Sequence, residues 1–337
     1  MGEFGLIERL ARALAERGVE PAAGSLPLGI GDDAAVLRLP PDRDLVATID
    51  ALVEETHFRR DWSRPEELGW KALAVNVSDL GGMGARPLGA LVTLAAPADT
   101  PVRWIDRLYR GLAECAARYG CPVVGGDTVK ASRQIALSVA ALGSVPTGRA
   151  VTRGGASAGD LVCVTGVLGE SGAGLALLEQ GSSRGLTGFK PLLDWHRRPE
   201  PPVEAGAVLA ERGLATAMLD LSDGLASDLR HLCRRSGAGA RVEAARLPIS
   251  DATRRAAAEL GRDPHHFALH GGEDYQLLFT VPPDRFAEVP PALGPLGVTA
   301  TIVGAVTRRG ITLVQPDGRT EPLRPKGFAH FAAAPER

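Results

Sequence analysis

The apolar residues of this chain recur in two spacings, and the first half of the sequence alternates between them. Apolar positions three and four residues apart predict amphipathic helices, whereas short apolar runs bounded by turn residues predict buried strands. Helices are predicted over residues 4–14, 65–80 and 102–119, and strands over 28–39, 44–49, 88–94, 122–124 and 134–145. This alternation predicts an α/β unit of about 150 residues.

Turn residues concentrate between Pro146 and Gly159, and this cluster predicts a boundary between two domains. We place the domains at residues 1–147 and 148–337. In the second domain, strands are predicted over residues 161–165, 216–219, 276–281, 298–303 and 311–314, and helices over 175–179 and 222–232. The expected fold class is therefore α/β, with two α/β domains.

Seven aspartates close predicted strands or lie at Gly-rich turns: Asp32, Asp33, Asp50, Asp79, Asp127, Asp220 and Asp223. Asp50 ends the strand 44–49, and Asp127 follows a pair of glycines. Ser222 lies between Asp220 and Asp223 and is predicted to cap the next helix. Carboxylates gathered in one cleft repel each other unless cations neutralise them, and a ligand set of oxygens without His or Cys suits Mg²⁺.

Asp79 stands out because it falls on a helix. A capping box at Ser63-Arg64-Pro65-Glu66 is predicted to open that helix, and the Gly81-Gly82 pair to end it. Asp79 follows Val75 by four residues and so lies on the face that packs inward. An acid on such a face requires a partner.

Each of these features also has a structural interpretation. Asp is common at turns because its carboxylate binds local amides, so one Gly-Asp pair alone favours a structural role. Five such places in one chain favour a ligand site. The GVLGESGAG segment has the composition of a phosphate-binding turn, but it also suits a plain strand-to-helix passage. His57 can be an exposed histidine, and Glu273 can pair with an arginine.

Composition and charge exclude several classes of function. The chain has 337 residues, 45% of them apolar, and a net charge of −2 without a basic run, so no nucleic-acid partner is expected. No segment has the length of a membrane span or the pattern of a signal peptide. The four cysteines lack metal-ligand spacing, which predicts reduced thiols in a cytoplasmic protein. A Walker A motif is absent because no lysine follows a glycine.

Eight segments together resemble the thiamine-monophosphate kinase family: GIGDDAAV, TIDALVEETHF, WKALAVNVSDLGGMGARP, VVGGDTV, GRAVTRGGASAGDLVCVTG, LDLSDGLASDL, HGGEDYQLLFTV and KGFAHF. The resemblance covers nearly the whole chain in order and spacing. It implies the fold group of aminoimidazole-ribonucleotide synthetase and selenophosphate synthetase. In that group the sheet of the N-terminal domain pairs across a homodimer, and the C-terminal domain covers the ATP cleft.

The resemblance also implies roles for individual residues. The Mg²⁺ ligands would be Asp33, Thr48, Asp50, Asp79, Asp127, Asp220 and Asp223, with Asp33 and Asp79 bridging ions. Nucleotide contacts would come from Gly126, Asp127, Arg153 and Ser222, and thiamine-phosphate contacts from His57, Glu273 and Phe328. Ile49 departs from the Ser or Thr usual in the family, so only its backbone carbonyl is available to a metal.

The expected reaction is ATP-dependent phosphorylation of thiamine monophosphate to thiamine diphosphate by direct, Mg²⁺-assisted transfer of the γ-phosphoryl group. The acceptor phosphate is already an anion, so no general base is expected. Two alternatives remain open from the sequence. One is a related ATP-dependent synthetase of the same fold group that acts on another small metabolite, and the other is a scaffold that binds nucleotide without turnover.

Overall fold

The computed structural model describes residues 9–10, 12–14, 16, 26, 28, 30, 34–181 and 186–326. The chain divides into two compact units, Met1–Val151 with Arg197–Gly213, and Thr152–His196 with Leu214–Arg337. The α/β class predicted from the sequence is confirmed in both units. The segment 197–213, which the predicted boundary at residue 148 assigns to the second domain, lies within the first unit.

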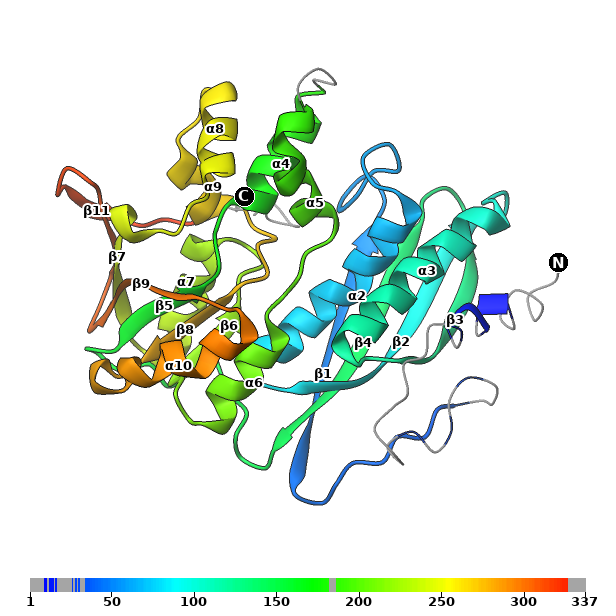
Figure 1. The fold of residues 1–337 in the computed structure, drawn as a ribbon, viewed down its shortest axis with the longest axis horizontal. Helices are drawn as coiled ribbons and strands as arrows, with labels where there is room; N and C mark the ends of the chain where they lie inside the picture. The colour runs from blue at the N-terminus through cyan, green and yellow to red at the C-terminus, as the bar shows by residue number, and fades with distance from the viewer. Residues whose placement is uncertain are drawn as a thin grey trace, which may run out of the picture. The chain divides into compact units, whose positions relative to one another are not determined.

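The first unit is a four-stranded sheet with long helices on one face (Figure 1). Its elements are β1 (Arg43–Val53), α2 (Pro65–Gly82), β2 (Arg86–Pro97), α3 (Val102–Tyr119), β3 (Val123–Ala131), β4 (Ala136–Pro146) and α6 (Val203–Glu211). The strand order is β1-β4-β2-β3, with β2 and β3 parallel and the other two pairs antiparallel. β1 and β3 therefore form the two edges of the sheet.

The core of this unit lies between the sheet and the helices α2 and α3. Leu73 of α2, Leu108 of α3 and Leu94 of β2 are all fully buried there. The opposite face of the sheet keeps large apolar side chains exposed, among them Leu45 and Ile49 on β1 and Val129 on β3. Because strand residues alternate between faces, one face packs the core and the other is uncovered within the described part of the unit.

Two local predictions for the first unit need correction. β1 and β3 run past the aspartates that were expected to follow them, because Asp50 still pairs with Val139 and Asp127 with Thr93. The N-cap of α2 is Arg64 rather than Ser63, since its N–H donates to Oε2 of Glu67 at 2.7 Å. The predicted end of this helix at the Gly81-Gly82 pair is confirmed, because α2 ends at Gly82.

The segment 197–213 is fixed to the first unit by specific contacts. Nε1–H of Trp70 donates to the carbonyl oxygen of Pro199 at 2.8 Å. The guanidinium of Arg198 lies 4.2 Å from the centre of the Trp70 ring and also binds Glu114 at 3.1 Å. These contacts combine burial, a cation–π interaction and an ion pair, and they explain why this segment returns to the first unit.

The second unit is built on a seven-stranded mixed sheet with the order β11-β10-β7-β9-β5-β8-β6. Its strands are β5 (Leu161–Thr165), β6 (Ala217–Asp220), β7 (Gly239–Glu243), β8 (Leu277–Val281), β9 (Ala300–Thr307), β10 (Ile311–Val314) and β11 (Thr320–Pro322). Its helices are α4 (Glu170–Glu179), α5 (Lys190–Arg197), α7 (Leu225–Ser236), α8 (Asp251–Glu259), α9 (Pro264–His270) and α10 (Val289–Leu293). Arg197, the last residue of α5, is where the chain passes to the first unit.

Two predictions at helix starts in this unit were wrong. α7 begins after Gly224, which adopts a left-handed φ of 90°, so Ser222 does not cap the helix. α4 begins at Glu170 rather than near Leu175, so the ESGAG part of the Gly-rich segment is already helical. Small residues there let other chain segments approach the helix closely.

Candidate functional site

A hydroxyl and a carboxylate meet between β1 and α2 in the first unit. Oγ1 of Thr48 donates to Oδ2 of Asp79 at 2.5 Å, in a half-buried position. Asp50 follows Thr48 by two residues on β1 and therefore lies on the same face of the sheet. Thr48, Asp50 and Asp79 thus form an all-oxygen group, which we call the β1–α2 acid group. Such donors match the preference of Mg²⁺.

The backbone beneath this group is held by a buried amide. The N–H of Asp50 donates to Oδ1 of Asn76 at 3.1 Å, and Nδ2 of Asn76 donates to the carbonyl of Ala72 at 2.9 Å. Asn76 is fully buried and was not among the predicted site residues, although it lies one helical turn before Asp79. Ile49 lies on the opposite face and is 67% exposed, so its side chain takes no part in the group.

Asp127 lies apart from the β1–α2 acid group within one chain. It pairs with Thr93, on the face of the sheet opposite to the buried Val92. β1 and β3 are separated by two strands, which places them about 14 Å apart at the usual strand spacing. Gly126 is required by packing, since a Cβ there would lie 2.0 Å from the carbonyl oxygen of Val92.

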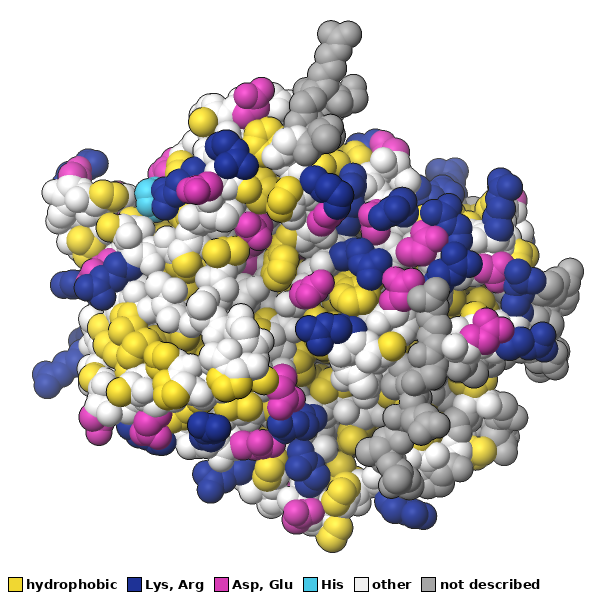
Figure 2. All heavy atoms as spheres, in the orientation of Figure 1, with side chains coloured by type: hydrophobic (Ala, Val, Ile, Leu, Met, Phe, Trp, Pro, Cys, Tyr) yellow, Lys and Arg dark blue, Asp and Glu magenta, His cyan; other side chains and the backbone are white. Residues whose placement is uncertain are grey.

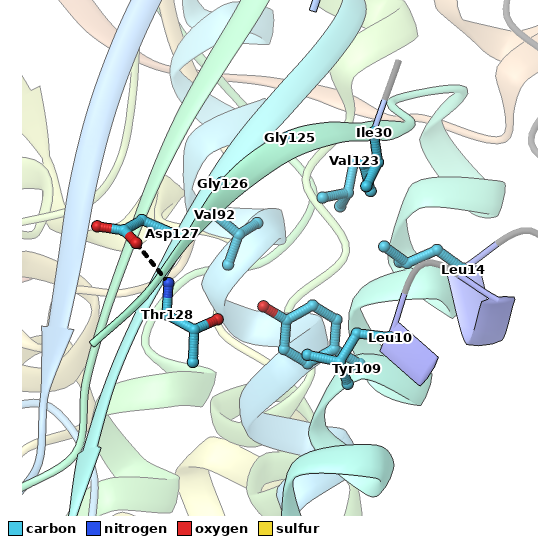
Figure 3. Close-up of a pocket in the computed structure, with 10 residues that line it drawn as sticks. All are labelled: Leu10, Leu14, Ile30, Val92, Tyr109, Val123, Gly125, Gly126, Asp127 and Thr128. Atoms are coloured by element: carbon cyan, nitrogen blue, oxygen red, sulfur yellow. Dashed lines mark hydrogen bonds between the residues drawn. The ribbon is translucent and has the colours of Figure 1, made fainter. Parts of the chain in front are cut away.

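A pocket opens on the helix side of β3 (Figure 3). Its volume is about 90 Å³, and its lining is mainly apolar. The residues that line it are Leu10, Leu14, Ile30, Val92, Tyr109, Val123, Gly125, Gly126, Asp127 and Thr128. Thr128 points toward Tyr109, whereas the carboxylate of Asp127 points away from it and accepts from the N–H of Thr128 at 2.8 Å. Sequence reasoning found Gly126 and Asp127 but missed Tyr109.

His57 lies half-buried in the turn that follows β1. Its ring Nδ1 accepts a hydrogen bond from the backbone N–H of Val53 at 3.1 Å. The backbone N–H of His57 in turn donates to the carbonyl oxygen of Val53 at 2.9 Å. A ring nitrogen that accepts carries no proton, so the neutral imidazole has its proton on Nε2. The turn therefore orients His57 with Nε2–H as a hydrogen-bond donor.

A second acidic group lies at the end of β6 in the second unit. Asp220 is buried, and the N–H of Asp223 donates to Oδ2 of Asp228 at 3.1 Å. Burial, together with the charges of Asp220 and Asp223, raises the pKa of Asp228 well above its usual value, and the charge of Arg153 opposes this shift. Carboxylates that repel each other in this way favour a bound cation. Asp228 was not among the predicted site residues, although it belongs to the LDLSDGLASDL segment, because it lies inside α7 past the turn that holds Asp220 and Asp223.

The structure brings the LDLSDGL and HGGEDY motifs side by side. The N–H of Glu273 donates to the carbonyl of Ser222, and the N–H of Tyr275 to the carbonyl of Leu221, both at 2.8 Å. Glu273 and Tyr275 adopt positive φ angles of 56° and 50°. Non-glycine residues in this region are strained and cluster at functional sites, so the turn itself indicates a function.

Asp274 of the same turn binds the start of α4. The N–H of Gly169 donates to both carboxylate oxygens of Asp274 at 3.0 and 2.9 Å. Burial raises the pKa of Asp274 to about 8, while the bonds from Gly169 and Ser171 lower it. The helix N-terminus that could attract a phosphate is thus already occupied by a carboxyl group of the chain itself. This favours the structural interpretation of the GVLGESGAG segment.

Two predicted site residues, Asp33 and Phe328, lie outside the described residues. Among the residues that the structure describes, no three His, Cys, Asp or Glu side chains converge as a ready metal site. No described helix is long and apolar enough to cross a membrane. On the face in Figure 2, described Lys and Arg side chains are interspersed with Asp and Glu, and neither sign forms a continuous patch.

Two family models match consecutive parts of the chain. The N-terminal domain of the AIR synthase related proteins matches residues 31–145, and their C-terminal domain matches residues 157–315. The structure of HypE from Escherichia coli, a hydrogenase maturation protein, has the same fold, with a TM-score of 0.75 at 22% identity over 96% of this chain and 98% of that one. The two family models thus assign the chain to the AIR synthase related proteins, and the fold agrees with this class.

More similar relatives identify a family within this class. Thiamine-monophosphate kinase of Escherichia coli K12 is 40% identical over 334 residues, covering 98% of both chains, and that of Mycobacterium tuberculosis is 43% identical over 82% of this chain and 80% of its own length. The crystal structure of the Stenotrophomonas maltophilia enzyme has a TM-score of 0.82 at 36% identity over 94% of this chain and 97% of that one. A structure described as "AaThiL complexed with AMPPCP and TMP" has a TM-score of 0.78 over 98% and 97%. The chain belongs to the thiamine-monophosphate kinase family.

Proposed function

We propose that this protein transfers the γ-phosphoryl group of ATP to the phosphate of thiamine monophosphate and releases thiamine diphosphate and ADP. The observation that carries the proposal is the match to thiamine-monophosphate kinases over nearly the full length of both chains. A related structure described with an ATP analogue and TMP supports the pair of substrates. The all-oxygen β1–α2 acid group supports the proposal, because such donors suit the Mg²⁺ that phosphoryl transfer uses.

Magnesium is the metal that best fits the described donors. Thr48, Asp50 and Asp79 in the first unit, and Asp220 and Asp223 in the second, offer hard oxygens and no nitrogen or sulfur. Burial raises the pKa of Asp228, and so do the charges of Asp220 and Asp223, which supports a cation close to the second group. When bound, Mg²⁺ would neutralise phosphate charge. Asp33 and Asp127 remain predicted ligands from the family resemblance.

The described residues also offer contacts for each substrate. Nε2–H of His57 suits an anionic phosphate oxygen, and the Glu273 carboxylate suits the cationic or amino part of thiamine monophosphate. The apolar pocket at Tyr109 suits the base of ATP, because an aromatic ring next to Gly126 can pack against a flat heterocycle. Arg153 and Ser222 remain predicted nucleotide contacts.

The acceptor needs little activation. The phosphate of thiamine monophosphate is an anion at neutral pH, so the protein need not remove a proton from the nucleophile. Catalysis then consists of aligning the two phosphates and offsetting their charge. The acids of the two groups are better used to hold cations than to accept the phosphoryl group, which favours direct transfer over a phosphoenzyme.

We further propose a homodimer and a cytoplasmic location. The exposed apolar residues Leu45, Ile49 and Val129 lie on one face of a sheet whose two edge strands pair with no further strand of the described unit. A second copy would cover this face and these edges. The test is the mass of the protein in solution, which should be twice that of the 35.2 kDa chain. Leu45→Glu should reduce this mass to that of a single chain, and Val102→Glu should leave it unchanged.

The proposed cytoplasmic location is supported by the cysteines. All four are free and buried, as expected in a reducing compartment.

A direct test of the reaction uses the full chain with ATP, Mg²⁺ and a panel of phosphorylated metabolites. Mass spectrometry of the products should show thiamine diphosphate and ADP in equal amounts, with thiamine monophosphate as the preferred acceptor. A different phosphorylated product would assign the protein to another reaction of the same fold class. Release of ADP in the presence of thiamine monophosphate, without any phosphorylated acceptor among the products, would contradict kinase activity toward thiamine monophosphate.

A further inference from the structure

A buried histidine contacts the side chain of Glu273. Nδ1 of His196, at the end of α5, lies 3.1 Å from Oε2 of Glu273 and 3.0 Å from Oγ of Ser171 on α4. The side chain of His196 is only 6% exposed, whereas that of Glu273 is 26% exposed. His196 thus contacts the Glu273 carboxylate from the buried side, while the Glu273 side chain remains partly exposed to solvent.

The chemistry of the three groups fixes the proton. A carboxylate only accepts hydrogen bonds, so the 3.1 Å contact requires a proton on Nδ1 of His196. The Ser171 hydroxyl lies within hydrogen-bond distance of the same nitrogen and can share that proton as an acceptor. Ser171 and Glu273 thus both contact Nδ1 of His196. In a nucleophile–base pair, by contrast, the serine and the carboxylate contact different ring nitrogens.

The surroundings make this arrangement rigid. Helices α4 and α5 touch so closely that a Cβ on Gly174 would lie 2.4 Å from the carbonyl oxygen of Leu192. Trp195, next to His196, donates from Nε1 to the carbonyl of Asp274 at 3.2 Å. Two successive residues of α5 therefore contact two successive residues of the strained turn. Such support is what a side chain held in one productive orientation needs.

We propose that His196, assisted by Ser171, is a positioning residue that fixes the carboxylate of Glu273 for the thiamine part of the substrate. The inference rests on the proposed function, and it assigns to α5 a role in acceptor binding. Prior fixing of a carboxylate removes the entropy loss of ordering it when the substrate binds. Loss of His196 should therefore weaken acceptor binding and leave ATP binding unchanged.

The test compares His196→Leu with His196→Asn in the full chain. Asn places Nδ2–H close to the position of the imidazole Nδ1–H, whereas Leu removes the donor. His196→Leu should raise KM for thiamine monophosphate about tenfold or more and change KM for ATP less than twofold, and His196→Asn should recover most of the loss. Adding His196→Leu to Glu273→Gln should cause little further loss, because both substitutions remove one contact.

Equal rises of both KM values, no rescue by Asn, or full additivity with Glu273→Gln would overturn the inference. An Asn variant with the wild-type melting temperature separates positioning from folding. If the wild-type protein fails to phosphorylate thiamine monophosphate, the proposed function fails, and ¹⁵N NMR of the His196 ring then decides the inference. A protonated Nδ1 that changes in Glu273→Gln supports the contact, and an Nε2–H tautomer in both proteins overturns it.

Discussion

The hydroxyl of Thr48 donates a hydrogen bond to the carboxylate of Asp79, with 2.5 Å between the two oxygens. This bond joins the edge strand β1 to the inward face of α2 and answers the need for a partner that the position of Asp79 implies. A hydroxyl next to a carboxylate also leaves further oxygen lone pairs for a cation. The pair is therefore both a structural link and the centre of the proposed metal site.

Asp79→Asn should lower turnover at least about a hundredfold, because one preorganised charge is removed from the site while its size is kept. Thr48→Val should cost less, about tenfold, since it removes one hydrogen bond to a charged group. Steady-state kinetics at saturating Mg²⁺ measures both effects. Asp99→Asn, in an exposed turn after β2, serves as the control and should retain full activity. Normal turnover of Asp79→Asn would remove this residue from the site.

For His57, the expected result depends on which ring nitrogen is replaced. Because Nδ1 accepts from Val53, the substrate contact belongs to Nε2–H, and the amide of Gln reproduces that position better than the amide of Asn. His57→Gln should therefore keep a KM for thiamine monophosphate several-fold lower than His57→Asn, on the scale of about 1 kcal/mol for one hydrogen bond. If Asn were the better substitute, the tautomer assigned to His57 would be wrong.

Tyr109→Leu tests the pocket beside β3. Loss of the aromatic ring should raise KM for ATP about fivefold, since ring contacts contribute roughly 1 kcal/mol beyond burial, and should leave KM for thiamine monophosphate unchanged. Tyr119→Leu is a matched control on the same helix, because Tyr119 does not line the pocket. The nucleobase would have to bind elsewhere if both variants had the same KM for ATP.

The raised pKa of Asp274 predicts that the free energy of unfolding of the protein depends on pH. Its pKa is raised to about 8 in the folded protein, mainly by burial, so the folded state binds this proton more tightly than the unfolded state. The contribution of Asp274 to stability is complete below about pH 4 and is lost as the pH rises through about 8. In calorimetry, the difference between the Tm of Asp274→Asn and the Tm of the wild type should therefore shift in favour of the variant as the pH is raised from 5 to 8. Parallel Tm curves would show that this carboxyl does not titrate in that range.

The sequence predicted the regular elements well where the apolar spacing was long. Helix 102–119 and strand 311–314 match α3 and β10. Element ends were less predictable, because β1 and β3 continue through polar residues that the neighbouring strands pair in register. Asp50 and Asp127 therefore lie within strands, although Asp and Gly usually signal a turn.

The candidate site was predictable only for residues inside recognisable motifs. Tyr109 and His196 lie on helices outside those motifs, where their spacing matches ordinary packing, so only tertiary contacts reveal them. The proximity of Ser222 to Glu273, fifty-one positions apart in the sequence, likewise depends on how β6 and the residues before β8 pair. Separations of this kind carry no local signal.

The central claim is that the γ-phosphoryl group passes directly from ATP to thiamine monophosphate. The most direct measurement follows ³²P from γ-labelled ATP through a single turnover of the full chain. All label should appear in the terminal phosphate of thiamine diphosphate, none should remain on the protein, and labelled ADP should not exchange into ATP without the acceptor. Stoichiometric label on the protein that thiamine monophosphate discharges, or no labelled thiamine diphosphate at all, would contradict the account.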